Sequence, residues 1–121
     1  MTPAQEEKAK AIIARQVEMS GHTIDALRRA GLSDSAEIQL DFSFNAPNEK
    51  SAQSLATHLK ENNCLNLSVQ KSGSLFARKY VVQGNTYPTQ VTTAVLAQWL
   101  PWIVVQGIVH GCDFDGWGAE V

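Results

Sequence analysis

The sequence is short of charge, of basic excess and of long apolar runs. Charged residues make up 18% of the 121 residues, and the formal net charge is −2. A chain without excess positive charge attracts phosphate backbones weakly, so we expect no direct nucleic-acid partner. The strongest apolar run, Ile103-Val104-Val105, ends at Gln106, far short of the roughly 20 apolar residues that cross a bilayer. We therefore expect no membrane association, and the lack of a signal-like start favours a cytoplasmic protein.

Cysteine is also scarce. Cys64 and Cys112 match no ligand spacing, so we expect free thiols that behave as small, mostly buried hydrophobic residues. His110 lies two positions before Cys112, but in an extended chain the two would merely share a face, which favours a structural role over a catalytic pair. The acidic and glycine residues near the C-terminus fit neither a calcium loop nor a phosphate loop. We expect no metal and no cofactor.

The N-terminal segment has strong helix signals at both ends. Thr2 and Gln5 fit a capping box, and Pro3 suits the first helical position. Gly31, which follows two arginines, is a typical helix stop. Ser20-Gly21 interrupts the apolar periodicity, so the pattern alone leaves open one long bent helix or two shorter ones.

Three strands and one helix are predicted in the middle of the chain. Residues 37–44, EIQLDFSF, alternate strictly between apolar and polar side chains, which is typical of a strand with one buried face. Asn48 is a candidate N-cap for a helix of about three turns. Two further extended runs, residues 65–70 and 75–83, are separated by a turn that contains Gly73 and indicate a hairpin.

The last third of the chain predicts a helix and then a strand. Thr89 is the candidate N-cap of this helix, and Pro101 inside it should kink or divide it. Gly107 or Gly111 should end it. The closing stretch 112–118, CDFDGWG, then forms the final strand.

The resulting order predicts an α+β fold. After the first helix it reads strand, helix, strand, strand, helix, strand, which is the ferredoxin-like or split βαβ pattern with a four-stranded antiparallel sheet. Right-handed crossovers place both helices on one face, with the first and third strands central. We expect residues 1–34 to be a helical segment packed on a domain formed by residues 36–121. Cys64 and Cys112 then begin opposite edge strands, too far apart for a disulfide.

The final strand poses a parity problem. Phe114 and Trp117 are three positions apart, so a regular strand would turn them to opposite faces. A bulge at Asp115-Gly116 would bring both aromatic side chains to the helix-covered face, and glycine tolerates the positive φ that a bulge can require. We therefore predict a bulge at Gly116 and a largely buried Trp117.

Aromatic side chains on the open sheet face would have a different meaning. Tyr80 on the third predicted strand and Trp117 on the fourth could stack RNA bases there. The net negative charge and carboxylates such as Asp113 argue against RNA and favour structural packing. We retain Asp113 and Tyr80 as candidates for contact with a protein partner.

The segment from EIQLDFSF to GCDFDGWGAEV resembles the bacterial regulator of ribonuclease activity B (RraB-like) family. The hallmark of that family is a C-terminal Tyr/Phe-Asp-Gly-Trp-Gly motif after the last helix, and the resemblance covers residues 36–121. It implies a single long N-terminal helix and a non-catalytic domain that binds a protein, as the best-known member binds ribonuclease E and inhibits RNA cleavage. This chain is less acidic than that member, which weakens long-range attraction to a basic scaffold. The matching residues are Phe114, Asp115, Gly116, Trp117 and Gly118.

Two other functions fit the composition. A small acidic domain suits an immunity-type protein that neutralises another enzyme by covering a basic active site. A small hydrolase or metal-dependent enzyme would have to use Asp113, Asp115, His110 and Cys112. Self-association through an edge strand or the open sheet face is also possible.

Overall fold

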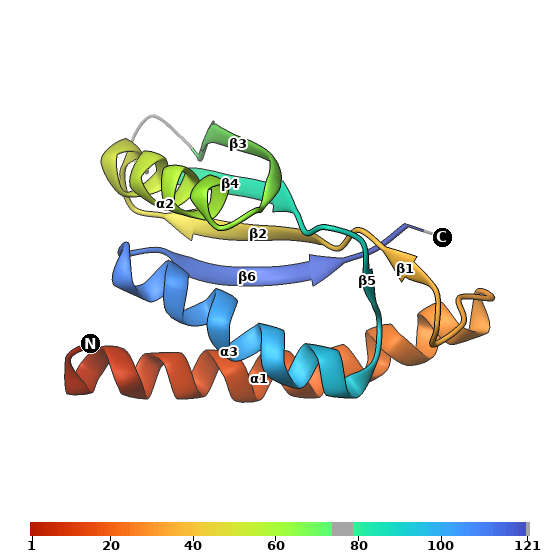
Figure 1. Cartoon of the computed structure of the whole chain (residues 1–121). Coiled ribbons are helices and arrows are strands. Elements are labelled where there is room, and N and C mark those ends of the chain that lie inside the picture. Colours follow the sequence, from red (N-terminus) through yellow and green to blue (C-terminus); the bar gives the residue numbers. More distant parts are fainter. Residues whose placement is uncertain (74–78, 121) are drawn as a thin grey trace.

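The computed structural model describes residues 1–73 and 79–120, and in these ranges the fold is α+β (Figure 1). An antiparallel sheet has the strand order β3-β4-β2-β6, so β2 and β4 are central and β3 and β6 are edges. Part of the predicted hairpin, residues 74–78, lies outside the described residues. The strands are β2 (Asp41–Ala46), β3 (Leu65–Ser72), β4 (Lys79–Asn85) and β6 (Asp113–Gly118).

A single helix, α1 (Pro3–Arg29), precedes the sheet. The predicted capping box is confirmed: the Thr2 side chain accepts from the Gln5 N–H, and the Gln5 side chain accepts from the Thr2 N–H. Gly31 follows the C-cap with φ +101, a conformation that glycine adopts without strain. The helix runs unbroken through Gly21, which decides between the two arrangements that the periodicity left open.

Two more helices connect the strands, α2 (Glu49–Glu61) and α3 (Thr93–Val109). Asn48 caps α2 as predicted, with its side chain accepting from the Ser51 N–H at 2.8 Å. Pro101 lies inside α3 but does not divide it. Figure 1 shows α1 running alongside α3, and the two helices are in contact.

The start and end of α3 correct one prediction and decide another. Its N-cap is Thr92, whose side chain accepts from the Val95 N–H at 3.1 Å. The predicted cap, Thr89, instead belongs to a short strand, β5 (Thr89–Gln90). This strand pairs with Glu37 and Ile38, which were predicted to begin the first strand. Gly111, with φ +76, ends the helix.

The predicted strand 37–44 is wrong in its continuity. It is divided into β1 (Glu37–Ile38), which pairs with β5, and β2, which belongs to the larger sheet. Leu40 lies at the break, where its N–H donates to Thr86 Oγ1 at 3.0 Å and its carbonyl accepts from the Thr86 N–H at 2.9 Å. These two bonds keep Leu40 paired while the chain passes from one sheet to the other.

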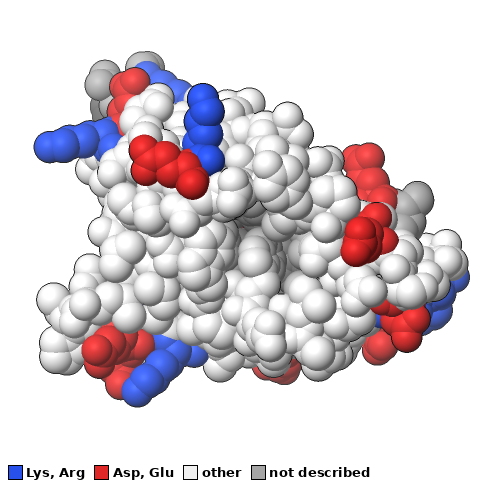
Figure 2. Space-filling model, in the orientation of Figure 1, with Lys and Arg blue, Asp and Glu red and all other residues white. Residues whose placement is uncertain are grey.

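The charged side chains on the face in Figure 2 lie mainly toward its periphery, and the middle of this face is uncharged and hollowed.

Within the described ranges, none of the helices has an apolar stretch long enough to cross a membrane.

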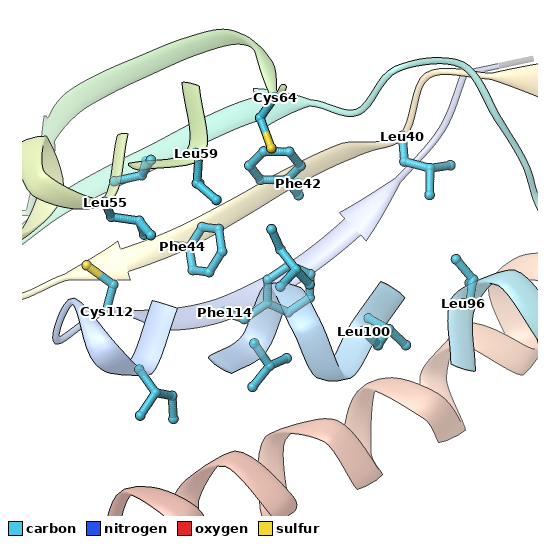
Figure 3. Close-up of a cluster of buried hydrophobic side chains, with 14 of the residues drawn as sticks. Leu40, Phe42, Phe44, Leu55, Leu59, Cys64, Leu96, Leu100, Cys112 and Phe114 are labelled. Atoms are coloured by element: carbon cyan, nitrogen blue, oxygen red, sulfur yellow. The ribbon is translucent and has the colours of Figure 1, made fainter. Parts of the chain in front are cut away.

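Both α2 and α3 cover the same face of the sheet. Phe42 and Phe44 of β2 lie in one core with Leu55 and Leu59 of α2 and Leu100 of α3 (Figure 3). Burial alternates along β2, as expected for a strand with one covered face: Phe42, Phe44 and Ala46 are buried, and the residues between them are not. Of the four apolar residues on the inner face of the predicted strand, Leu40, Phe42 and Phe44 are therefore buried in the core, and Ile38 is partly buried against it.

Glycine at position 107 lets α3 approach the sheet closely. A Cβ there would lie 2.6 Å from Phe44 Cε2 and 3.0 Å from the Cys112 carbonyl oxygen. We expect Gly107→Ala to lower the free energy of unfolding by about 1–3 kcal/mol through overpacking. Gly21→Ala is the matched control in another helix, because a Cβ there meets nothing within 4 Å. It should stabilise by about 0.5–1 kcal/mol. Urea denaturation measures both, and equal effects would contradict the packing argument.

Candidate functional site

The C-terminal motif contains a β-bulge. Along β2, Ser43 pairs with Gly116, but the next residue, Phe44, pairs with Phe114, so Asp115 is the additional residue on β6. Gly116 has φ +146, in the region that glycine favours. The predicted bulge is confirmed, and it brings the two aromatic residues of the motif to the same face of the sheet.

Trp117 shares the helix-covered face with its cross-strand partner Phe42. Its indole N–H donates to Ser20 Oγ of α1 at 2.8 Å, and that hydroxyl donates to the Gln16 carbonyl at 2.6 Å. The indole is only partly buried, less than predicted, because β6 is an edge strand and leaves one flank of the ring uncovered. Trp117 thus links the sheet edge to α1.

The other residues of the motif and its neighbour Asp113 mainly pack, pair or form contacts within the fold. Phe114 is buried, with its ring centroid 5.2 Å from that of Phe44 in an edge-on arrangement. Gly118 pairs with Asp41, and Asp115 is exposed on the bulge. Asp113 forms a 2.7 Å ion pair with Lys8 of α1, and both side chains are about half exposed.

Tyr80 does not lie on the open face of the sheet. It pairs with Ala46 and has the same parity as buried Val82, so it points to the helix side, where it packs against the core. The open-face hypothesis for Tyr80 and Trp117 is therefore wrong. Described residues on the opposite face of the two central strands are mainly polar, among them Asp41, Ser43, Asn45, Gln83 and Asn85.

The two cysteines are free and buried, as predicted. Burial raises the pKa of the Cys112 thiol to about 11, and the Asp113 carboxylate adds to the rise. The thiol points to the backbone carbonyls of Ser51 and His110, at 3.7 Å and 3.6 Å. It is therefore protonated at neutral pH and is not paired with the His110 ring.

A polar cluster lies between α2 and the end of α3. His110 Nδ1 lies 2.9 Å from Ser54 Oγ, and His58 Nε2 lies 2.5 Å from Gln106 Oε1. The two imidazole rings are 4.9 Å apart between centroids and tilted by 36°. Burial and, second, the charge of His58 lower the pKa of His110 from its ordinary value of 6.5. Across the described ranges, no three His, Cys, Asp or Glu side chains are grouped to hold a metal ion.

The structure contains a groove with aromatic walls that the sequence pattern did not predict. Its cavity volume is about 510 Å³, and it lies between the end of α2, the connection from β4 to β5, and the first half of α3. It corresponds to the hollow in the middle of the face in Figure 2. Twelve residues line it: Leu40, Asn62, Asn63, Cys64, Thr86, Tyr87, Pro88, Thr89, Val95, Gln98, Trp99 and Trp102. We call this feature the aromatic groove.

The aromatic groove combines a fixed ring with exposed ones. Trp99 is held by Phe42 and Phe114, with ring centroids 6.3 Å and 6.0 Å away. Tyr87 is 55% exposed and Trp102 is 36% exposed. The sequence signal was the i, i+3 spacing of the two tryptophans, which is equally typical of a core-facing helix and so does not identify a groove.

No protein-family model matches this chain, and no similar sequence is found among curated proteins. The RraB-like resemblance therefore stays a prediction that depends on the C-terminal motif. The aromatic groove is a candidate site on geometry alone, through its volume, its exposed rings and its uncharged lining.

Replacing the bulge glycine should reveal backbone strain. Gly116→Ala forces alanine to φ +146, and we expect a loss of about 1–3 kcal/mol in the free energy of unfolding. Gly118→Ala is the matched control on the same strand, since a Cβ at neither position meets an atom within 4 Å and only Gly116 has a positive φ. It should change stability by less than about 0.5 kcal/mol. Similar losses in both variants would argue against strain at the bulge.

Stability should fall in mild acid because of His110. Its folded-state pKa lies below the unfolded value of about 6.5, so the unfolded chain binds more protons as the pH drops. The contribution is complete above about pH 6.5 and is lost as the pH falls below that value toward the folded pKa. His110→Asn, which can still bond Ser54, should flatten the dependence of stability on pH between 7 and 5. Denaturant midpoints measured across this range provide the test, and an unchanged slope would exclude His110 as the cause.

Proposed function

We propose that this protein is a non-catalytic regulator that acts by binding another protein, and that the aromatic groove is its contact surface. The observation that carries the proposal is the exposure of Tyr87 and Trp102 on the walls of one uncharged groove. Tryptophan and tyrosine are the residues that most often dominate binding energy at protein interfaces, where they are surrounded by contacts that exclude water.

The contacts of the candidate catalytic residues support a binding role. The Cys112 thiol is buried against backbone carbonyls, the His110 ring contacts Ser54, and the Asp113 carboxylate pairs with Lys8. Each side chain therefore has a different partner. These contacts assemble no nucleophile and base from the residues that a hydrolase of this sequence would have to use.

We assign the fold to the ferredoxin-like class, preceded by a helix. The support is the strand order β3-β4-β2-β6, together with α2 between β2 and β3 and α3 before β6. β1 and β5 are short additions to that pattern. The same order fits the RraB-like resemblance, which makes ribonuclease E the partner we propose to test first.

The test uses purified ribonuclease E and a fluorescent RNA substrate. A stoichiometric amount of this protein should bind the enzyme and slow cleavage. Trp102→Ala should weaken binding tenfold or more, equivalent to about 1.4 kcal/mol. Met19→Ala, which truncates a similarly exposed side chain on α1, should leave affinity unchanged. The ribonuclease assignment fails if neither binding nor slower cleavage is seen.

A further inference from the structure

The walls of the aromatic groove come from segments far apart in the sequence. Val95, Trp99 and Trp102 lie on one face of α3 at i, i+4, i+7 spacing, and Tyr87-Pro88 lies in the connection between β4 and β5. Leu40 and Cys64 are almost fully buried and form apolar lining. An occupant would therefore contact aromatic rings from two separate segments.

The charge of the lining restricts the occupant. None of the twelve lining residues is Lys, Arg, His, Asp or Glu, although both signs of charge occur elsewhere on the same face (Figure 2). A charged side chain entering this groove would lose water without gaining an opposite charge, which is unfavourable. The segment that fits should therefore carry no charge where it enters the groove.

The polar groups of the lining restrict it further. Asn63 and Gln98 have side-chain amides, Tyr87 has a hydroxyl, and the tryptophans have indole N–H groups, all of which can donate hydrogen bonds. Hydrogen-bond donors placed between flat aromatic rings suit a ligand whose backbone carbonyls are free to accept. A helical ligand bonds its carbonyls internally and would leave these donors without partners.

We propose that the aromatic groove binds an extended, uncharged, proline-containing segment of the partner protein in the polyproline II conformation. In that conformation the backbone has no internal hydrogen bonds, and its carbonyls are free to accept. Proline rings pack flat against aromatic side chains, and an already extended segment loses little entropy on binding. The inference rests on the proposed function in taking a protein as the ligand, but it does not depend on ribonuclease E being that protein.

The experiment is selection from a random dodecapeptide library displayed on phage, with the full chain as bait. Trp102→Ala, Tyr87→Ala and Met19→Ala are used in parallel, and thermal denaturation checks that each variant is folded. We expect uncharged sequences rich in proline to be enriched on the native chain and on Met19→Ala. Both groove variants should lose the enrichment. The best peptide, made synthetically, should quench or shift tryptophan fluorescence and bind Trp102→Ala at least tenfold more weakly.

Other results would overturn the inference. Enrichment of charged or helix-forming peptides, equal enrichment on the groove variants, or no enrichment at all would each exclude the proposed ligand. So would dimerisation of the native chain that Trp102→Ala abolishes in sedimentation measurements, because a second copy would then occupy the groove. Ribonuclease E binding distinguishes the two proposals: equal affinity for native and Trp102→Ala chains keeps the partner and excludes the groove. Proline-rich enrichment without ribonuclease binding would keep the groove as the binding site and exclude ribonuclease E as the partner.

Discussion

The contact between Phe44 and Gly107 sets the position of α3, and much of the molecule depends on that position. Phe44 is fully buried at the centre of the sheet, and the absence of a side chain at Gly107 lets the helix rest directly on its ring. Two turns earlier in α3, Trp99 packs against Phe42 and Phe114. With Trp99 held there, Trp102 is placed on the wall of the aromatic groove. The same helix provides the surface against which α1 packs.

Features set by neighbouring residues could be predicted from the sequence. The caps at Thr2 and Asn48 are short-range hydrogen bonds between residues three apart. The bulge at Gly116 followed from the parity of two aromatic residues and one glycine, because side chains in a regular strand alternate between its two faces and only an extra residue brings positions 114 and 117 to the same face. The positions of the buried residues in β2 followed from the same alternation.

Features set by distant residues could not be predicted. The first strand breaks near Leu40 because Thr86, 46 positions later, bonds its backbone. Thr92 rather than Thr89 caps α3 because β5 pairs with β1, which local sequence does not reveal. The aromatic groove needs four segments that meet only in the folded chain, and its tryptophans have the spacing of ordinary core residues. The face of Tyr80 depends on the register of β4 with β2, which alternation within one strand does not determine.

The side chain of Arg28, at the end of α1, joins segments that lie far apart in the sequence. Its guanidinium donates to the backbone carbonyls of Leu32 and Val91, the second of them 63 residues away, at the junction of β5 and α3. Closing so long a loop costs more chain entropy than forming a local turn, so contacts of this kind slow folding. The segment that bears Tyr87 is held at both ends, by the bonds between Thr86 and Leu40 on one side and by Arg28 at Val91 on the other. The groove consequently exists only in fully folded molecules, and a partner that uses it would discriminate against incompletely folded chains.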